Sequence, residues 1–189
     1  MGGPIRQVLL ISWEDDPYMQ SKRIGLRSPS EQTLSAPNSQ LILNWVATCK
    51  ENHPLCQADK GTLSFPTRVI DVGPVETTID PNLILSSEHK SAYIALSHCW
   101  GNSAVSQFQA RTTTSNLRGM LAGFTLDSLP ANFRDAIITT RRLGYQYLWI
   151  DSLCIIQDSA DDWAVESAKM DEVYRNADLV IAAFVQNIH

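Results

Sequence analysis

Polar and aromatic residues follow two apolar runs of the sequence, 93–97 and 147–151, which have the composition of buried strands. They are Ser97 at the end of the first run with His98, Cys99, Trp100 and Gly101 after it, and Asp151 at the end of the second run with Ser152 and Cys154 after it. Open parallel sheets bind ligands at the carboxyl ends of their strands, so these residues predict a polar site with an aromatic wall. Taken singly, each residue is more typical of a turn cap or of core packing. Their joint position favours a site.

Glu166 is a carboxylate on the apolar side of a predicted helix, 160–176. In a helical projection, one arc of roughly 100° contains Trp163, Met170, Val173, Tyr174 and Ala177. Glu166 lies inside the same arc. A buried carboxylate is costly unless it is paired or faces a cavity. Two interpretations remain open: a core acid satisfied by an arginine or by backbone amides, or an acid facing a cleft where chemistry occurs.

Nucleophilic hydrolysis is poorly supported by the same residues. Ser97 and His98 are neighbours on a strand and point to opposite faces, so the histidine cannot activate the serine while the chain is extended. The objection also weakens a pair of His98 and Cys99. The sequence contains neither common glycine-rich phosphate loop nor a catalytic zinc motif.

Cys49, His53 and Cys56 have the residue types and short spacing of zinc ligands. They provide only three ligands, however, and the helix-breaking Pro54 follows the histidine. Free cysteine behaves as a small buried apolar residue, so we favour thiols that pack a helix–loop junction. No metal is predicted.

Composition narrows the class of protein. The chain has 189 residues, of which 44% are hydrophobic and 19% charged, and its formal net charge is −5 with scattered basic residues. These values are typical of a globular domain and speak against a nucleic-acid partner. No apolar run approaches the roughly 20 residues that span a bilayer. Four dispersed cysteines and no recognisable signal segment predict a reducing, cytoplasmic location.

The elements that would hold the site alternate along the chain. Apolar runs predict strands at 67–72, 83–85, 93–97, 147–151 and 179–184, and helical periodicity predicts helices at 41–50, 130–143 and 160–176. Pro130 suits the first turn of its helix, and Gly144 suits its end. This alternation predicts an α/β fold, a Rossmann-like, doubly wound parallel sheet flanked by helices.

Two stretches flank or interrupt these elements. We expect residues 1–65 to form a helical and extended appendage with a Ser/Pro-rich linker at 27–40, and residues 66–189 to form the α/β domain. The polar stretch 102–128 is predicted to be a long, lid-like loop.

The sequence resembles the fungal heterokaryon incompatibility (HET) domain family. Its three signature blocks are similar to YIALSHCWG at 93–101, LPANFRDAIITTRRLGYQYLWIDSLCIIQD at 129–158 and DWAVESAKMDEVYRNADLVIAA at 162–183. The upstream WVATCKENHPLC and FPTRVIDV resemble the region that commonly precedes this domain. The resemblance implies a cell-death effector in fungal non-self recognition, a form of innate immunity.

The HET family has in turn been related to Toll/interleukin-1 receptor (TIR) domains, some of which cleave NAD at the nicotinamide–ribose bond. The resemblance implies a TIR-like fold whose first strand is 93–97. Those enzymes carry a catalytic Glu shortly after a Trp on a helix, and Trp163 and Glu166 are similar. Glu166 is therefore the implied catalytic residue. The residues expected to bind substrate are Ser97, His98, Trp100, Gly101, Asp151, Ser152, Cys154 and Trp163.

Three functions follow as expectations: an NAD glycohydrolase that needs no cofactor and takes NAD or a related nucleotide as substrate, a non-catalytic module that recruits a death pathway by assembly, or a degenerate relative. Self-association and a sensor protein in trans are the expected protein partners. The sequence ends at His189, soon after the third strand of the signature region. Either upstream strands complete the sheet, or the domain is truncated at its C-terminus.

Overall fold

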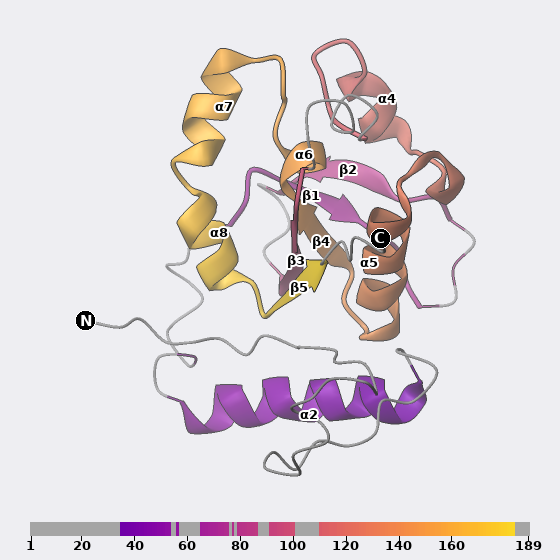
Figure 1. The fold of residues 1–189 in the computed structure, drawn as a ribbon, viewed down its shortest axis with the longest axis vertical. Coiled ribbons are helices and arrows are strands. Elements are labelled where there is room, and N and C mark those ends of the chain that lie inside the picture. The colour runs from indigo at the N-terminus through magenta and orange to yellow at the C-terminus, as the bar shows by residue number, and fades with distance from the viewer. Residues whose placement is uncertain are drawn as a thin grey trace, which may run out of the picture.

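The computed structural model describes residues 35–53, 56, 65–75, 77, 79–86, 91–100 and 110–183. These residues form an α/β fold in which helices flank a five-stranded sheet (Figure 1). The α/β class predicted from the sequence is therefore confirmed. Residues 1–34 of the predicted appendage, the predicted binding residue Gly101 and the predicted strand end at Phe184 lie outside the described residues.

The strands form one sheet in the order β2-β1-β4-β3-β5. They are β1 (Arg68–Asp71), β2 (Asn82–Leu85), β3 (Tyr93–His98), β4 (Tyr147–Ile150) and β5 (Leu179–Ala183), close to the predicted runs. The first four residues of β3 and all of β4 are buried. Strands covered on both faces need apolar side chains in both directions, which explains their unbroken apolar runs.

Strand direction differs from the prediction in one place. β3 pairs in parallel with β4 and with β5, as expected. β1 runs antiparallel to both β2 and β4, so the sheet is mixed and the prediction of a fully parallel sheet is wrong for β1. The connection between β1 and β2 is only ten residues long, and its described residues, 72–75, 77 and 79–81, hold no helix. A parallel neighbour needs a crossover of a dozen or more residues, usually helical, so this short connection returns the chain antiparallel.

The reversed strand matters for the site. The upstream strands β1 and β2 extend the sheet beyond β4. The register pairs Asp71 with Tyr147 and Ile70 with Leu148, so the start of β1 runs toward the carboxyl end of β4. Thr67, immediately before β1, consequently lies at the edge of the sheet where β3 and β4 end.

Helices lie on both faces of the sheet. The described ones are α2 (Ala36–Asn52), α4 (Leu117–Ala122), the 3₁₀ turn η3 (Leu126–Ser128), α5 (Ala131–Arg142), α6 (Asp151–Cys154), α7 (Ala160–Ser167) and α8 (Met170–Asn176). Figure 1 shows α5 on one side of the sheet and α7 with α8 on the other. The predicted end of α5 is confirmed: Arg141 and Arg142 form its last turn, and Gly144 follows with φ of 75°.

Two predicted segments differ in detail. The single helix predicted at 160–176 is divided at Ala168 and Lys169 into α7 and α8. The loop predicted at 102–128 contains α4 and η3 in its described part. Thr112 anchors this part, since its amide donates to the Ser152 carbonyl and its own carbonyl accepts from Gln157 N–H. This tertiary attachment is invisible to local periodicity.

Helix α2 is longer than predicted and docks on the α/β layer. Its Ile42 belongs to the hydrophobic core, and Lys50 forms an ion pair with Asp178, which also accepts a hydrogen bond from the Tyr145 hydroxyl at 3.1 Å. Among the helices of the described segments, none combines the length and the apolar character that crossing a membrane requires.

Candidate functional site

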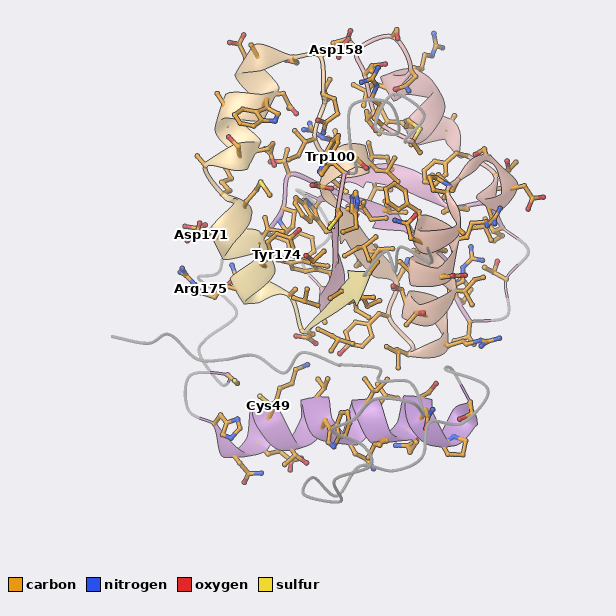
Figure 2. All side chains as sticks on the ribbon, in the orientation of Figure 1. Cys49, Trp100, Asp158, Asp171, Tyr174 and Arg175 are labelled. Atoms are coloured by element: carbon orange, nitrogen blue, oxygen red, sulfur yellow. The ribbon has the colours of Figure 1, made fainter. Side chains whose placement is uncertain are left out.

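Asp151 is the centre of a polar cluster at the carboxyl ends of β3 and β4. Its Oδ2 accepts a 2.8 Å hydrogen bond from Trp100 Nε1, and its Oδ1 lies 2.9 Å from His98 Nε2. The Ser152 N–H donates to Oδ1 at 2.7 Å. We call Asp151, His98 and Trp100 the Asp151 cluster. Trp100 lies beside α6 at this edge of the sheet (Figure 2).

His98 is held in this cluster by rings as well as by charge. Its side chain is 1% exposed, packs edge-on against Phe133 of α5 with ring centroids 4.9 Å apart, and stacks on Trp100 at 6.1 Å. Burial disfavours the charged imidazole, but the hydrogen bond to Asp151 and its charge, with the Cys99 carbonyl, outweigh that effect and raise the pKa of His98 above 6.5. Asp151 thus favours the protonated imidazole of His98.

Glu166 forms a second polar cluster on α7. It is the buried residue of that helix, as the sequence predicted, and its side chain is 4% exposed. Thr67 donates a 2.5 Å hydrogen bond to Oε1, and Lys169 Nζ lies 3.4 Å from the same oxygen. We call Glu166, Thr67 and Lys169 the Glu166 cluster. Throughout the described segments, the hydrogen bonds of this carboxylate all go to Oε1, which leaves Oε2 uncommitted.

The pKa of Cys154 is affected by the carboxylates of both clusters, Asp151 and Glu166. The pKa of its thiol is raised to about 12. Burial is the main cause and the charges of Asp151 and Glu166 add to it, while a backbone hydrogen bond from Ile150 and the Arg68 charge oppose them. A thiol with that pKa is almost entirely protonated at neutral pH and is a poor nucleophile. The arrangement therefore does not support cysteine chemistry.

Arg68 ties the same edge together. Its Nε donates to the Cys154 carbonyl at 2.7 Å, and its guanidinium contacts Asp162 at 2.6 Å. Asp162 also accepts from the Ile156 N–H at 2.8 Å. A buried arginine is tolerated because these acceptors satisfy it. The loop after α6 is thus fastened to the start of β1.

Two buried donors at this edge lack partners. Over the described residues, Trp149 Nε1 and the Ser152 hydroxyl are the buried side-chain polar atoms without a hydrogen bond. Trp149 packs edge-on against Tyr174 of α8, with centroids 5.4 Å apart. Buried polar groups are normally satisfied, so each of these two donors is an exception within the described residues.

The comparison with known protein families assigns the chain. The family model for heterokaryon incompatibility proteins (HET) matches residues 93–188, just over half of the chain. The chain belongs to the HET family. Comparison with curated proteins and with solved structures found no match. Membership supports a role in heterokaryon incompatibility and cell death.

The HET segment holds every residue of the predicted site, but not every hydrogen-bond partner of those residues. Asp151, His98, Trp100 and Glu166 lie inside residues 93–188, whereas Thr67, the closest donor to Glu166, lies upstream. The structure brings the first three together and places Glu166 in a separate cluster, although the sequence favoured one joint site. A residue upstream of the HET segment therefore donates a hydrogen bond to a carboxylate inside it.

The remaining predicted residues occupy varied positions. Ser97 is exposed on β3, opposite Ala182 of β5, and Trp163 is 54% exposed on α7. Ser152 and Cys154 are buried in α6. Neither Ser97 nor Trp163 joins the contacts described above for the Asp151 and Glu166 clusters.

Sequence reasoning missed Thr67, Arg68 and Lys169. Lys169 follows Glu166 by three residues, a spacing at which opposite charges meet on a helix surface, so a signal for it existed. Thr67 and Arg68 precede their partners by more than 80 residues. No local pattern reports such contacts.

Proposed function

We propose that this HET domain acts in the cytoplasm as a cell-death effector that cleaves NAD, or a related nucleotide, at the nicotinamide–ribose bond. The observation that carries the proposal is the position of Glu166: a buried carboxylate, with one oxygen uncommitted, among elements that meet at the sheet edge holding the Asp151 cluster. A TIR-like arrangement and activation by self-association or by a sensor protein in trans belong to the same proposal.

The chemistry asks for a group of this kind. When the bond between the ribose carbon C1′ and the pyridinium nitrogen breaks, nicotinamide leaves with the electron pair and positive charge develops on the ribose. A carboxylate near C1′ or the ribose hydroxyls stabilises that charge. Water then adds to C1′ and loses its proton, which completes hydrolysis. Trp100, half-buried at this edge, offers an indole face that attracts a pyridinium cation.

A second candidate is the non-catalytic assembly module. It is favoured by the pairing of Glu166 with Thr67 and Lys169, since an acid satisfied inside the fold can be purely structural. Trp163, more than half exposed on α7, is the kind of aromatic residue enriched in protein interfaces. Under this candidate the same protein assembles without turning over nucleotide.

Nicotinamide release separates the two candidates. The purified full chain is incubated with NAD at low and at high protein concentration and with a crowding agent that promotes assembly. We expect release by the wild type and a loss of about 100-fold or more for Glu166→Gln, an isosteric change that removes the charge. Glu172→Gln is the matched control, because Glu172 is an exposed glutamate of the neighbouring helix α8.

The outcomes are distinct. Circular dichroism and the unfolding midpoint of Glu166→Gln establish that the variant is folded before its activity is compared. If Glu166→Gln releases nicotinamide as fast as the wild type, Glu166 is not a catalytic residue. No release by the wild type under any of these conditions would sink the NAD-cleaving proposal and leave the assembly module, for which oligomer formation is then measured directly.

A further inference from the structure

The end of helix α2 brings three metal-ligating side chains together outside the site described above. The ligand atoms of Cys49, His53 and Cys56 all lie within 4.8 Å of one another. Cys49 Sγ is 3.2 Å from Cys56 Sγ and 3.3 Å from His53 Nδ1. Sequence spacing alone favoured thiols that pack a helix–loop junction. The structure shows in addition that all three ligand atoms lie close together.

The backbone explains how these residues converge. Cys49 and His53 are four residues apart at the end of α2 and therefore lie on one face of the helix. The His53 N–H donates to the Cys49 carbonyl at 3.1 Å, which closes the last turn. The Cys56 N–H then donates to the His53 carbonyl at 2.8 Å, which turns the chain back so that Cys56 meets Cys49.

The geometry fits a zinc ion better than a disulfide. With Zn–S bonds of about 2.3 Å in a tetrahedron, two thiolate sulfurs lie roughly 3.7 Å apart. The observed 3.2 Å needs an adjustment of about half an ångström to reach that value. A disulfide needs a sulfur separation of about 2.05 Å, which is a shift more than twice as large. Thiolate and imidazole are also the ligand types that zinc prefers.

The surroundings suit a structural cation. Cys49 and Cys56 are half-buried, and α2 ends beside them, where the helix dipole favours positive charge. Lys50, adjacent to Cys49, forms the ion pair with Asp178 that joins α2 to the α/β layer. Asp178 in turn donates its N–H to the Tyr93 carbonyl at the start of β3, 3.0 Å away. Figure 2 shows Cys49 on α2, below the sheet and its helices.

We propose that Cys49, His53 and Cys56 bind one zinc ion that fixes the turn after α2, beside the ion pair that joins α2 to the α/β layer, with the fourth coordination position filled by water or by another side chain. Such a site cross-links the turn after α2, because opening the turn would break three metal–ligand bonds. It is independent of the proposed NAD chemistry.

Metal content tests the site. The full chain, expressed in zinc-supplemented medium and purified without a polyhistidine tag, is measured by inductively coupled plasma mass spectrometry. We expect about one zinc per chain, and background zinc for the double substitution Cys49→Ser with Cys56→Ser. Cys99→Ser is the matched control, since Cys99 is an exposed thiol outside the cluster, and it should retain the metal.

A second measurement uses the wild type alone, in case the double variant fails to fold. Removal of zinc with a chelator should lower the melting temperature, and adding zinc back should restore it. Cobalt added to the apoprotein should produce thiolate-to-cobalt charge-transfer absorption that His53→Gln alters. Background zinc in the zinc-grown wild type would overturn the proposal. So would a disulfide linking Cys49 to Cys56 in peptides mapped from protein kept under reducing conditions.

Discussion

Asp151 and Glu166 are both carboxylates beside the carboxyl ends of the parallel strands, yet the fold holds them differently. Asp151 is 13% exposed and is bound through both oxygens, by His98, by Trp100 and by an adjacent backbone amide. Glu166 is 4% exposed and is bound through one oxygen. Asp151 therefore orients two rings, whereas Glu166 Oε2 accepts no hydrogen bond from the described residues.

The origin of the partners differs as well. The partners of Asp151 come from the end of the neighbouring strand, within the HET segment. The closest partner of Glu166 comes from just before β1, 99 residues earlier in the chain. The Glu166 cluster thus depends on the reversed direction of β1, while the Asp151 cluster depends only on the parallel pair β3 and β4.

The largest expected effect is on the alkylation rate of Cys154, whose thiol pKa is raised by burial and by the charges of both carboxylates. With that pKa at about 12 against an ordinary value of about 8.5, the thiolate fraction at pH 8 falls by a factor on the order of 1000. We expect native alkylation by iodoacetamide at pH 8, followed by peptide mass spectrometry, to modify exposed Cys99 at least about 1000-fold faster than Cys154. Comparable rates would mean that the Cys154 thiol is open to solvent, against its burial in α6.

The next largest effect is the loss of stability when one hydrogen-bond donor is removed from each carboxylate. Thr67→Val removes the shortest hydrogen bond to Glu166 and should lower the free energy of unfolding by about 2 kcal/mol, since a buried carboxylate is left with a long contact to Lys169. Trp100→Phe removes one donor from Asp151, which retains two others, and should cost about 1 kcal/mol or less.

Urea unfolding of both variants at pH 7 measures this difference. Thr114→Val serves as a control, because Thr114 donates to the exposed Asp158 and the loss should be small. A larger loss for Trp100→Phe than for Thr67→Val reverses the ranking, and would make Asp151 the more dependent carboxylate.

The smallest effect is a pH dependence confined to the Asp151 cluster. The folded-state pKa of His98 is raised above 6.5, so the folded protein binds the proton more tightly than the unfolded chain. The resulting stabilisation is complete below pH 6.5 and is lost as the pH rises through the folded-state pKa. The stability difference between wild type and His98→Gln should therefore be larger at pH 5.5 than at pH 8.5, as measured by urea unfolding at both values. A difference that grows with pH contradicts the assigned ion pair.

Much of the local structure was predictable from the sequence. The unbroken apolar runs at 93–97 and 147–151 predicted two buried strands, and Gly144 predicted the end of α5. The helical projection predicted that Glu166 is buried, but it also placed Trp163 on the buried side, which is wrong. The projection assumed one straight helix, and the chain divides at Ala168 and Lys169 into two short ones.

The sequence by itself determined which segments become strands and helices, and which polar residues stand at the ends of β3 and β4. Only the tertiary structure decided that β1 runs antiparallel, that Thr67 reaches Glu166, and that the polar residues divide into two clusters. The physical reason is the distance along the sequence over which each interaction acts. Periodicity and turn chemistry act over a few residues, whereas strand direction and register depend on the whole sheet, and one reversed strand decides which distant side chain meets a carboxylate.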